Sequence, residues 1–211
     1  MSVDDGCIAV LSGPSGSGKT TLLNCLGLLE RPTSGRIVYG GEIDVTKLGY
    51  RARLKYRRHN IGYLLQTPAL VENETVSKNL RLARTRRRER PKPEEEALER
   101  VGLAGIQKEK IYHLSGGERQ RITLAQLLIK NPPIVLLDEP TSALDNDNTH
   151  MVIDVMGELS AEGASIIVAT HSDQIRACAD IEYEMPLNSP RSKGVVSECS
   201  AGDALNYSSN G

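Results

Sequence analysis

A glycine-rich octapeptide near the start of the chain constrains the fold more than any other feature. Residues 13–20 read GPSGSGKT, between the apolar run Cys7–Leu11 and a helix-compatible stretch from Lys19 to Leu29. In such a strand–loop–helix setting, glycines let successive backbone N–H groups point at phosphate oxygens, and the helix adds the positive end of its dipole. We therefore expect phosphate binding by Gly13, Pro14, Ser15, Gly16, Ser17, Gly18, Lys19, Thr20 and Thr21.

The lysine and the first threonine of this loop have distinct expected roles, and a later strand supplies their acidic partners. Lys19 would reach the β- and γ-phosphates, and the Thr20 hydroxyl would ligate Mg²⁺. The run Ile134–Leu137 is typical of a strand buried on both faces, and Asp138 and Glu139 follow it directly. Adjacent residues at a strand end point in different directions, so one carboxylate can hold metal while the other orients water. These motifs together predict an NTPase.

The rest of the chain alternates between strand and helix patterns. Runs of strand length occupy residues 36–39, 61–65, 134–137, 165–169 and 181–185. Helical patterns occupy residues 51–58, 75–83, 94–101 and 151–159, and a further helix begins near Gly116. This alternation predicts an α/β layered domain with a mainly parallel sheet flanked by helices. After about residue 185 the periodicity fades, so we expect a weakly ordered tail over residues 186–211.

Composition excludes several functions that a chain of this size could have. The 211 residues hold 26 Lys and Arg against 27 Asp and Glu, so bulk attraction to nucleic acid is not expected. No apolar run approaches the length of a spanning helix, and no secretory signal is visible, so we expect the cytosol. The four cysteines, Cys7, Cys25, Cys178 and Cys199, are too scattered for a zinc site. The arginine-rich stretch at 84–92 indicates either a solvated loop or an anionic-lipid contact.

A second glycine-containing motif decides which kind of NTPase is expected. Residues 114–121 read LSGGERQR, and two glycines and a serine ahead of a helix offer a second phosphate-binding surface. Here the sequence resembles the nucleotide-binding domain of ATP-binding-cassette (ABC) proteins, whose signature is this string. The resemblance implies that Ser115, Gly116, Gly117 and Glu118 bind the γ-phosphate held by the opposite subunit.

The resemblance runs from about Gly6 to about Ile181 and implies further site residues. Gln66 falls at the family's Q-loop, which senses the nucleotide and adds a metal contact. Asp145, in residues 142–145, is similar to the D-loop, and His171 to the switch histidine. By this resemblance the catalytic residues are Glu139, His171, Gln66 and Lys19, and the metal residues are Thr20, Gln66 and Asp138. The implied ABC ATPase domain spans residues 1–185, with a helical signature subdomain at about 67–130.

Within the family, several strings resemble the bacterial lipoprotein-release and macrolide-export branch, and in particular its bacteriocin-export members. The strings are residues 27–35, residues 61–66 and the ENETV sequence at residues 72–76, near the surface that receives a permease coupling helix.

The sequence departs from the family's pattern in two places. The family's N-terminal strands and the aromatic that stacks on adenine are absent from their usual place, so we expect an incomplete antiparallel β subdomain. Gln126 stands where the family often has arginine, a change not expected to abolish activity.

The function implied by the resemblance is that of a transport motor. The chain would hydrolyse ATP with Mg²⁺ as the motor subunit of a bacterial exporter, paired with a second ABC subunit in a homodimer. Its other partner would be an integral-membrane permease, with the chain peripheral on the cytoplasmic face and no nucleic acid involved. Two alternatives stay open: a soluble ABC ATPase acting in DNA repair or on ribosomes, and a nucleotide-binding module with impaired turnover.

Overall fold

One twisted sheet organises the described part of the chain. The computed structural model describes residues 1–84, 93–141, 146–187 and 197–200. In these ranges a six-stranded sheet has the order β4-β5-β6-β1-β7-β8. Its strands are β1 (Ile8–Ser12), β4 (Ile61–Leu64), β5 (Ile134–Asp138), β6 (Ser165–Ala169), β7 (Ile181–Glu184) and β8 (Ser197–Ser200). All neighbours are parallel except β7 and β8, so the carboxyl ends of the first five strands meet at one edge.

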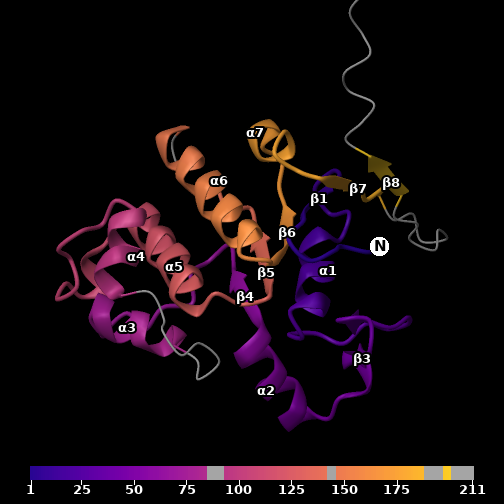
Figure 1. Ribbon diagram of the computed structural model, residues 1–211, viewed down its shortest axis with the longest axis horizontal. Coiled ribbons are helices and arrows are strands. Elements are labelled where there is room, and N and C mark those ends of the chain that lie inside the picture. The colour runs from indigo at the N-terminus through magenta and orange to yellow at the C-terminus, as the bar shows by residue number, and fades with distance from the viewer. Residues whose placement is uncertain (85–92, 142–145, 188–196, 201–211) are drawn as a thin grey trace, which may run out of the picture.

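Helices cover both faces of this sheet (Figure 1). On one face lie α1 (Lys19–Leu26) and α2 (Tyr50–Asn60), packed around the core that contains Leu11 and Leu136. On the other face lie α5 (Gly116–Lys130), α6 (Asn146–Ala161) and the short α7 (Asp173–Arg176). The predicted α/β class with a mainly parallel sheet is therefore confirmed.

Two smaller units flank the sheet. The helices α3 (Val76–Ala83) and α4 (Glu94–Arg100) both pack on α5 and form the helical part of the chain. The second unit is a two-stranded antiparallel sheet of β2 (Val38–Tyr39) and β3 (Ile43–Asp44), followed by the 3₁₀ turn η1 (Val45–Lys47). A second 3₁₀ turn, η2 (Ile111–His113), precedes α5. The strand predicted over 36–39 thus shortens to Val38–Tyr39, because it pairs only with the short β3.

The core is built without large aromatics other than tyrosine. The sequence has no Phe and no Trp, and the buried side chains are chiefly Leu, Ile, Val and Ala. Tyr183 is the exception in size: it is fully buried, and its hydroxyl exchanges hydrogen bonds with the backbone of Ser2. This contact ties the N-terminal segment to β7. Cys7, Cys25 and Cys178 are free thiols, as the scattered spacing predicted.

The C-terminal region contributes the last strand of the sheet. Within residues 186–211, where we expect a weakly ordered tail, Ser197–Ser200 forms β8 and pairs antiparallel with β7. The exposed edge of β7 offers unpaired backbone groups, and a nearby chain segment satisfies them whatever its side-chain pattern. The basic stretch 85–92 and the expected D-loop at 142–145 lie outside the described residues. Among the helices that the structure describes, none is long and apolar enough to cross a membrane.

Candidate active site

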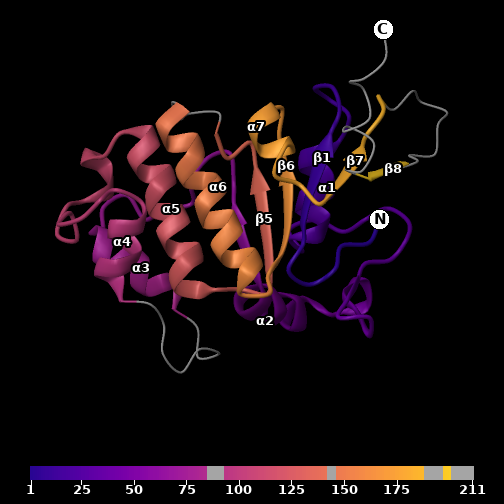
Figure 2. The ribbon, with the colours of Figure 1, turned by 45° about the horizontal axis from the view of Figure 1, so that its top comes forward.

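The loop between β1 and α1 has the backbone shape that phosphate binding requires. Gly13, Gly16 and Gly18 all have positive φ, at 136°, 80° and 94°. Gly18 occupies the N-cap of α1 and no side chain caps that end, so the first N–H groups of the helix are left for a ligand. At Gly13 a Cβ would lie 2.2 Å from the backbone oxygen of Met185, so only glycine fits. This loop joins β1 to α1 at the carboxyl edge of the sheet (Figure 2).

Lys19 is held at the centre of the loop by the loop's own carbonyl groups. Its Nζ donates to the oxygens of Gly13 at 2.7 Å and Pro14 at 3.2 Å, and the residue is only 8% exposed. A buried ammonium needs such acceptors, because an unpaired charge in the interior is costly. The same donors can pass to phosphate oxygens when a nucleotide occupies the loop, as predicted for this lysine.

Thr20 and Asp138 come together from different elements, as the sequence predicted for a magnesium site. The Thr20 hydroxyl at the start of α1 donates to Asp138 Oδ1 at the end of β5, at 3.3 Å. Mg²⁺ typically takes one or two protein oxygens and completes its shell with water and phosphate, so this pair fits it. Nearby, the Ser17 hydroxyl is buried and has no hydrogen-bond partner within the described residues. An orphaned hydroxyl inside the loop is a donor for a bound phosphate.

In the protein without ligand, the surroundings of Asp138 destabilise its ionised form. Burial raises its pKa, and the hydrogen bond from Thr20 and the charge of Lys19 only partly oppose this. A raised native pKa gives stability that is complete below the unfolded pKa of aspartate and is lost as pH rises through the native pKa. At neutral pH the ionised Asp138 therefore costs stability, which a bound cation would offset.

We predict that Asp138→Asn stabilises the ligand-free protein at neutral pH while removing most of its activity. The amide keeps an acceptor for Thr20 and carries no charge to bury, so the melting temperature in EDTA rises. If Asp138 holds Mg²⁺ as the sequence predicts, the predicted ATP hydrolysis falls by about a hundredfold or more, because a bound metal supplies several kcal/mol of charge stabilisation. The stability difference between the two proteins should vanish in acid, below the unfolded pKa. A lower melting temperature for the variant at neutral pH would contradict this account.

Glu139 and His171 stand at the same edge, beside the lysine. The Nε2 atom of His171 lies 3.3 Å from Lys19 Nζ and 3.6 Å from Glu139 Oε1. When Nε2 carries a lone pair, the ring can accept a hydrogen bond from Lys19. When Nε2 carries the proton, it is the Glu139 carboxylate that can interact with it. The backbone of Glu139 is left-handed, with φ at 47°, and is held by its N–H bond to Ala169 at 2.9 Å. Such strain in a non-glycine residue is typical of functional sites.

The signature residues form the capped beginning of α5 in another part of the chain. Ser115 is the N-cap: its hydroxyl accepts from the N–H of Glu118, and the Glu118 carboxylate accepts from the N–H of Ser115 at 2.8 Å. The Ser115 hydroxyl also donates to the Glu118 carboxylate at 2.7 Å, and this bond first, then the one from the Ser115 N–H, lowers the pKa of Glu118. Gly116 and Gly117 form the first turn, and Ser115 and Gly116 are exposed. Figure 2 shows α5 and α1 on opposite sides of β5, so the structure does not bring these residues to Lys19.

Two further predicted site residues are not joined to this cluster. Gln66 is exposed just beyond β4, and within the described residues it makes no hydrogen bond to Thr20 or Asp138. It nevertheless lies near the shared carboxyl edge, because β4 pairs in parallel with β5. Asp145 lies outside the described residues. The roles expected for both residues stay predictions.

Polar contacts on α5 were missed by the sequence reasoning. The Gln120 side chain is buried and donates to the carbonyl of Pro140, two residues after Asp138. Arg119 donates to Glu72 at 3.2 Å and to the carbonyl of Leu114 at 3.0 Å. Gln126, noted as a departure from the family, donates to the backbone of Asn79 on α3 at 2.9 Å. These residues join the signature helix to its surroundings, and only their polar type within a helical pattern hinted at this.

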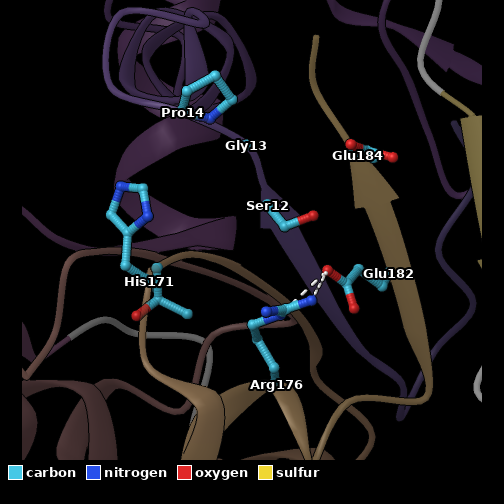
Figure 3. Close-up of a pocket in the computed structure, with 8 residues that line it drawn as sticks. Ser12, Gly13, Pro14, His171, Arg176, Glu182 and Glu184 are labelled. Carbon is cyan, nitrogen blue, oxygen red and sulfur yellow. Dashed lines mark hydrogen bonds and ion pairs between the residues drawn. The ribbon is translucent and has the colours of Figure 1, made fainter. Parts of the chain in front are cut away.

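A polar pocket of about 440 Å³ lies beside the loop and was also missed (Figure 3). His171, Ser12 and Pro14 border it on the side of the loop, and Glu182 and Glu184 of β7 border it on the other. Its wall is stiffened by Arg176, whose guanidinium lies 2.8 Å from Glu182. Ser12 of β1 pairs with Glu184 of β7, and side chains alternate along a strand, so Ser12, Glu182 and Glu184 lie on one face of the sheet. This arrangement depends on the pairing of the two strands, which the sequence alone does not show.

Comparison with known protein families identifies the family of this chain. The model of a family described as "ABC transporter" matches residues 1–142 of the chain. The chain belongs to the ABC transporter family. The ABC transporter ATP-binding protein YvrO of Bacillus subtilis is 38% identical to this ABC protein over 85% of the chain and 80% of the relative. The lipoprotein-releasing system ATP-binding protein LolD 1 of Rhodopseudomonas palustris is 37% identical over 85% and 82%.

Solved structures agree with this membership. A post-hydrolysis dimer of the ATP-binding cassette MJ0796 bound to ADP and Pi matches with a TM-score of 0.81 and 28% identity, over 95% of this chain and 88% of that one. A second dimeric structure of MJ0796, described as a bacterial ABC transporter cassette, gives 0.79 and 31%, over 88% and 84%. The chain is thus an ABC ATPase with an ATP-binding cassette. The predicted resemblance, including its lipoprotein-release branch, is confirmed.

Proposed function

We propose that this ABC protein is the motor subunit of a bacterial exporter on the cytoplasmic face of the membrane. Two copies close head to tail around two MgATP, and their opening after hydrolysis moves a separate integral-membrane permease. One observation carries the proposal: Lys19 and Glu139 share one edge of the sheet, whereas Ser115 heads a helix elsewhere in the same chain. Each chain therefore holds both halves of a site that only two copies complete.

The proposed chemistry is attack of water on the γ-phosphate. Glu139 orients the water and accepts its proton, and Lys19 and His171 stabilise charge on the transferred phosphoryl group. The Ser115 hydroxyl and the N–H groups of Gly116 and Gly117 bind the γ-phosphate from the second copy. Thr20 and Asp138, with Gln66, would hold Mg²⁺, which neutralises phosphate charge when bound.

Partnership with a permease is supported by the segment that holds Val71 and Glu72. Its backbone is bonded to η2, with the Ile111 N–H donating to the Glu74 carbonyl at 3.1 Å and the Tyr112 N–H to the Glu72 carbonyl at 3.2 Å. Val71 and Tyr112 are exposed apolar side chains there. The ion pair between Glu72 and Arg119 joins this surface to the signature helix, so a bound permease segment can be sensed at Ser115. The export direction rests on the likeness to the lipoprotein-releasing LolD 1.

The head-to-tail dimer is tested by mixing two inactive variants. Lys19→Ala removes the phosphate contact of the loop, and Ser115→Arg blocks the signature, so each protein alone should be inactive. An equal mixture should recover up to about a quarter of wild-type ATP hydrolysis, since half of the random dimers are mixed and each holds one intact site. No recovery, with both variants folded and able to pair, would rule out composite sites.

Salt extraction of solubilised membranes tests the partner. A transport motor stays with an integral protein when detergent-solubilised membranes are washed with concentrated salt, because apolar contacts such as those available to Val71 and Tyr112 are not screened by salt. A chain that acts on nucleic acid is released by salt, as phosphate contacts are exchanged for counterions. Release by salt together with binding to nucleic acid would favour the alternative of a repair or ribosome-associated ATPase.

A further inference from the structure

The helix α2 carries positive charge far beyond what the whole chain suggests. Its sequence, YRARLKYRRHN, has four arginines, one lysine and one histidine and no acidic residue. The chain as a whole has a formal net charge of −1, so this concentration is local. No residue of α2 is fully buried, and the helix leads straight into β4. In Figures 1 and 2 it lies at the lower end of the molecule.

One side of α2 is attached to the protein and the other is free. Arg53 donates to the carbonyls of Leu28 at 2.9 Å and Glu30 at 3.2 Å, and the Tyr56 ring stacks on Tyr39 at 5.7 Å between centroids. The opposite side is exposed and continuous, because it follows the spacing i, i+1, i+4, i+5 and i+8. This free face consists of Tyr50, Arg51, Leu54, Lys55 and Arg58.

The charges near this face have no compensating partners in the described part of the chain. None of the ion pairs formed there involves Arg51, Lys55, Arg57 or Arg58. The positive charges of this region also act on Lys130, whose Nζ donates a hydrogen bond to the Ile61 carbonyl at 2.6 Å. Burial first, and then the charges of Arg57 and Arg58, lower the pKa of Lys130 to about 8. An accumulation of like charge that the protein does not neutralise indicates an anionic partner outside it.

We propose that the free face of α2 binds the anionic surface of a lipid membrane. The inference deepens the proposed function, and rests on its placement of the chain at the membrane, by giving this protein a lipid contact of its own. Arg51, Lys55 and Arg58 pair with headgroup phosphates, while Tyr50 and Leu54 enter the interfacial region beside them.

The apolar residues of the face distinguish lipid from nucleic acid as the partner. Tyr50 is 72% exposed and Leu54 is 38% exposed, and both lie on the same side of the helix. The phosphate backbone of a nucleic acid is contacted by charged and polar groups, so an exposed leucine gains little there. At a membrane surface, tyrosine and leucine are removed from water while the neighbouring arginine and lysine side chains meet anionic headgroups. The apolar and the basic residues of the face therefore both contribute to binding.

The inference is tested with the purified protein and protein-free vesicles, so it needs neither permease nor ATP turnover. Co-sedimentation is measured with vesicles of phosphatidylcholine mixed with phosphatidylglycerol and with vesicles of phosphatidylcholine alone. The variant Arg51→Gln/Lys55→Gln removes two bases from the free face. The matched control, Lys108→Gln/Lys110→Gln, removes two exposed bases from the loop before η2. Circular dichroism and thermal melting verify that both variants are folded.

We expect binding to the anionic vesicles only, weakened by added salt. The α2 variant should bind about 30-fold less tightly, since each base near an anionic surface contributes about 1 kcal/mol and a tenfold change corresponds to about 1.4 kcal/mol. The control should stay within about twofold of wild type, and Tyr50→Ser/Leu54→Ser should also weaken binding. Equal loss in both charge variants, equal binding to both vesicles, or full displacement by duplex DNA would overturn the inference. None of these outcomes bears on the mixing test of the motor.

Discussion

Glu139→Gln is expected to lower the rate of Mg²⁺-dependent ATP hydrolysis by about 10²- to 10⁴-fold, the range that general-base catalysis typically contributes. The amide has nearly the shape of the carboxylate but cannot take a proton from water. Lys19 and the loop are untouched, so ATP still binds. Under our proposal, the variant should accumulate as a nucleotide-bound dimer, because closure no longer leads to hydrolysis and reopening.

The measurement is phosphate release at saturating ATP, with size-exclusion chromatography in MgATP to detect the dimer. A control for the loss of one carboxylate is Glu99→Gln on the exposed side of α4, which should stay within about twofold of wild type. Hydrolysis by Glu139→Gln at the control rate would remove Glu139 from the mechanism. A low rate with weak ATP binding would instead indicate that Glu139 supports the site structurally.

Gly13→Ala is expected to destabilise the protein by about 3 kcal/mol and to abolish most nucleotide binding. The new Cβ would lie 2.2 Å from the backbone oxygen of Met185, and neither backbone can swing away as a flexible side chain would. The φ of 136° adds strain of its own. Relief requires β1 and the chain after β7 to separate, which displaces the loop that cradles phosphate.

The matched control is Gly16→Ala in the same loop. Its φ of 80° is also unfavourable for alanine, but no atom lies within 4 Å of the added Cβ. It should therefore cost only about 1 kcal/mol, the strain of a left-handed residue. Urea unfolding measures both changes, and titration with a fluorescent ATP analogue measures binding. Equal destabilisation in the two variants would show that backbone conformation, and not the contact with Met185, requires glycine at position 13.

Much of the site followed from local pattern. A glycine-rich loop between an apolar run and a helix places Lys19 and Thr20 without knowledge of the rest of the fold. Asp138 was predictable as well, because parallel strands end at the same edge. It accepts a hydrogen bond from Thr20, and its role as a metal ligand stays a prediction. The assignment of Gln66, Asp145 and the signature rested on resemblance, and the geometry of one chain leaves their roles as predictions.

The sequence by itself determined the order of the elements, the residues that can meet phosphate and the fold class, because these depend on periodicity and on glycine chemistry within a few residues. Tertiary structure decided what depends on distant segments coming together. The pairing of β8 with β7, the bond from Gln120 to Pro140 and the raised pKa of Asp138 are of this kind. So is the free face of α2, since the anchoring of Arg53 and Tyr56 selects which bases face outward. Burial and pairing are properties of the packed chain, and no short window of sequence contains them.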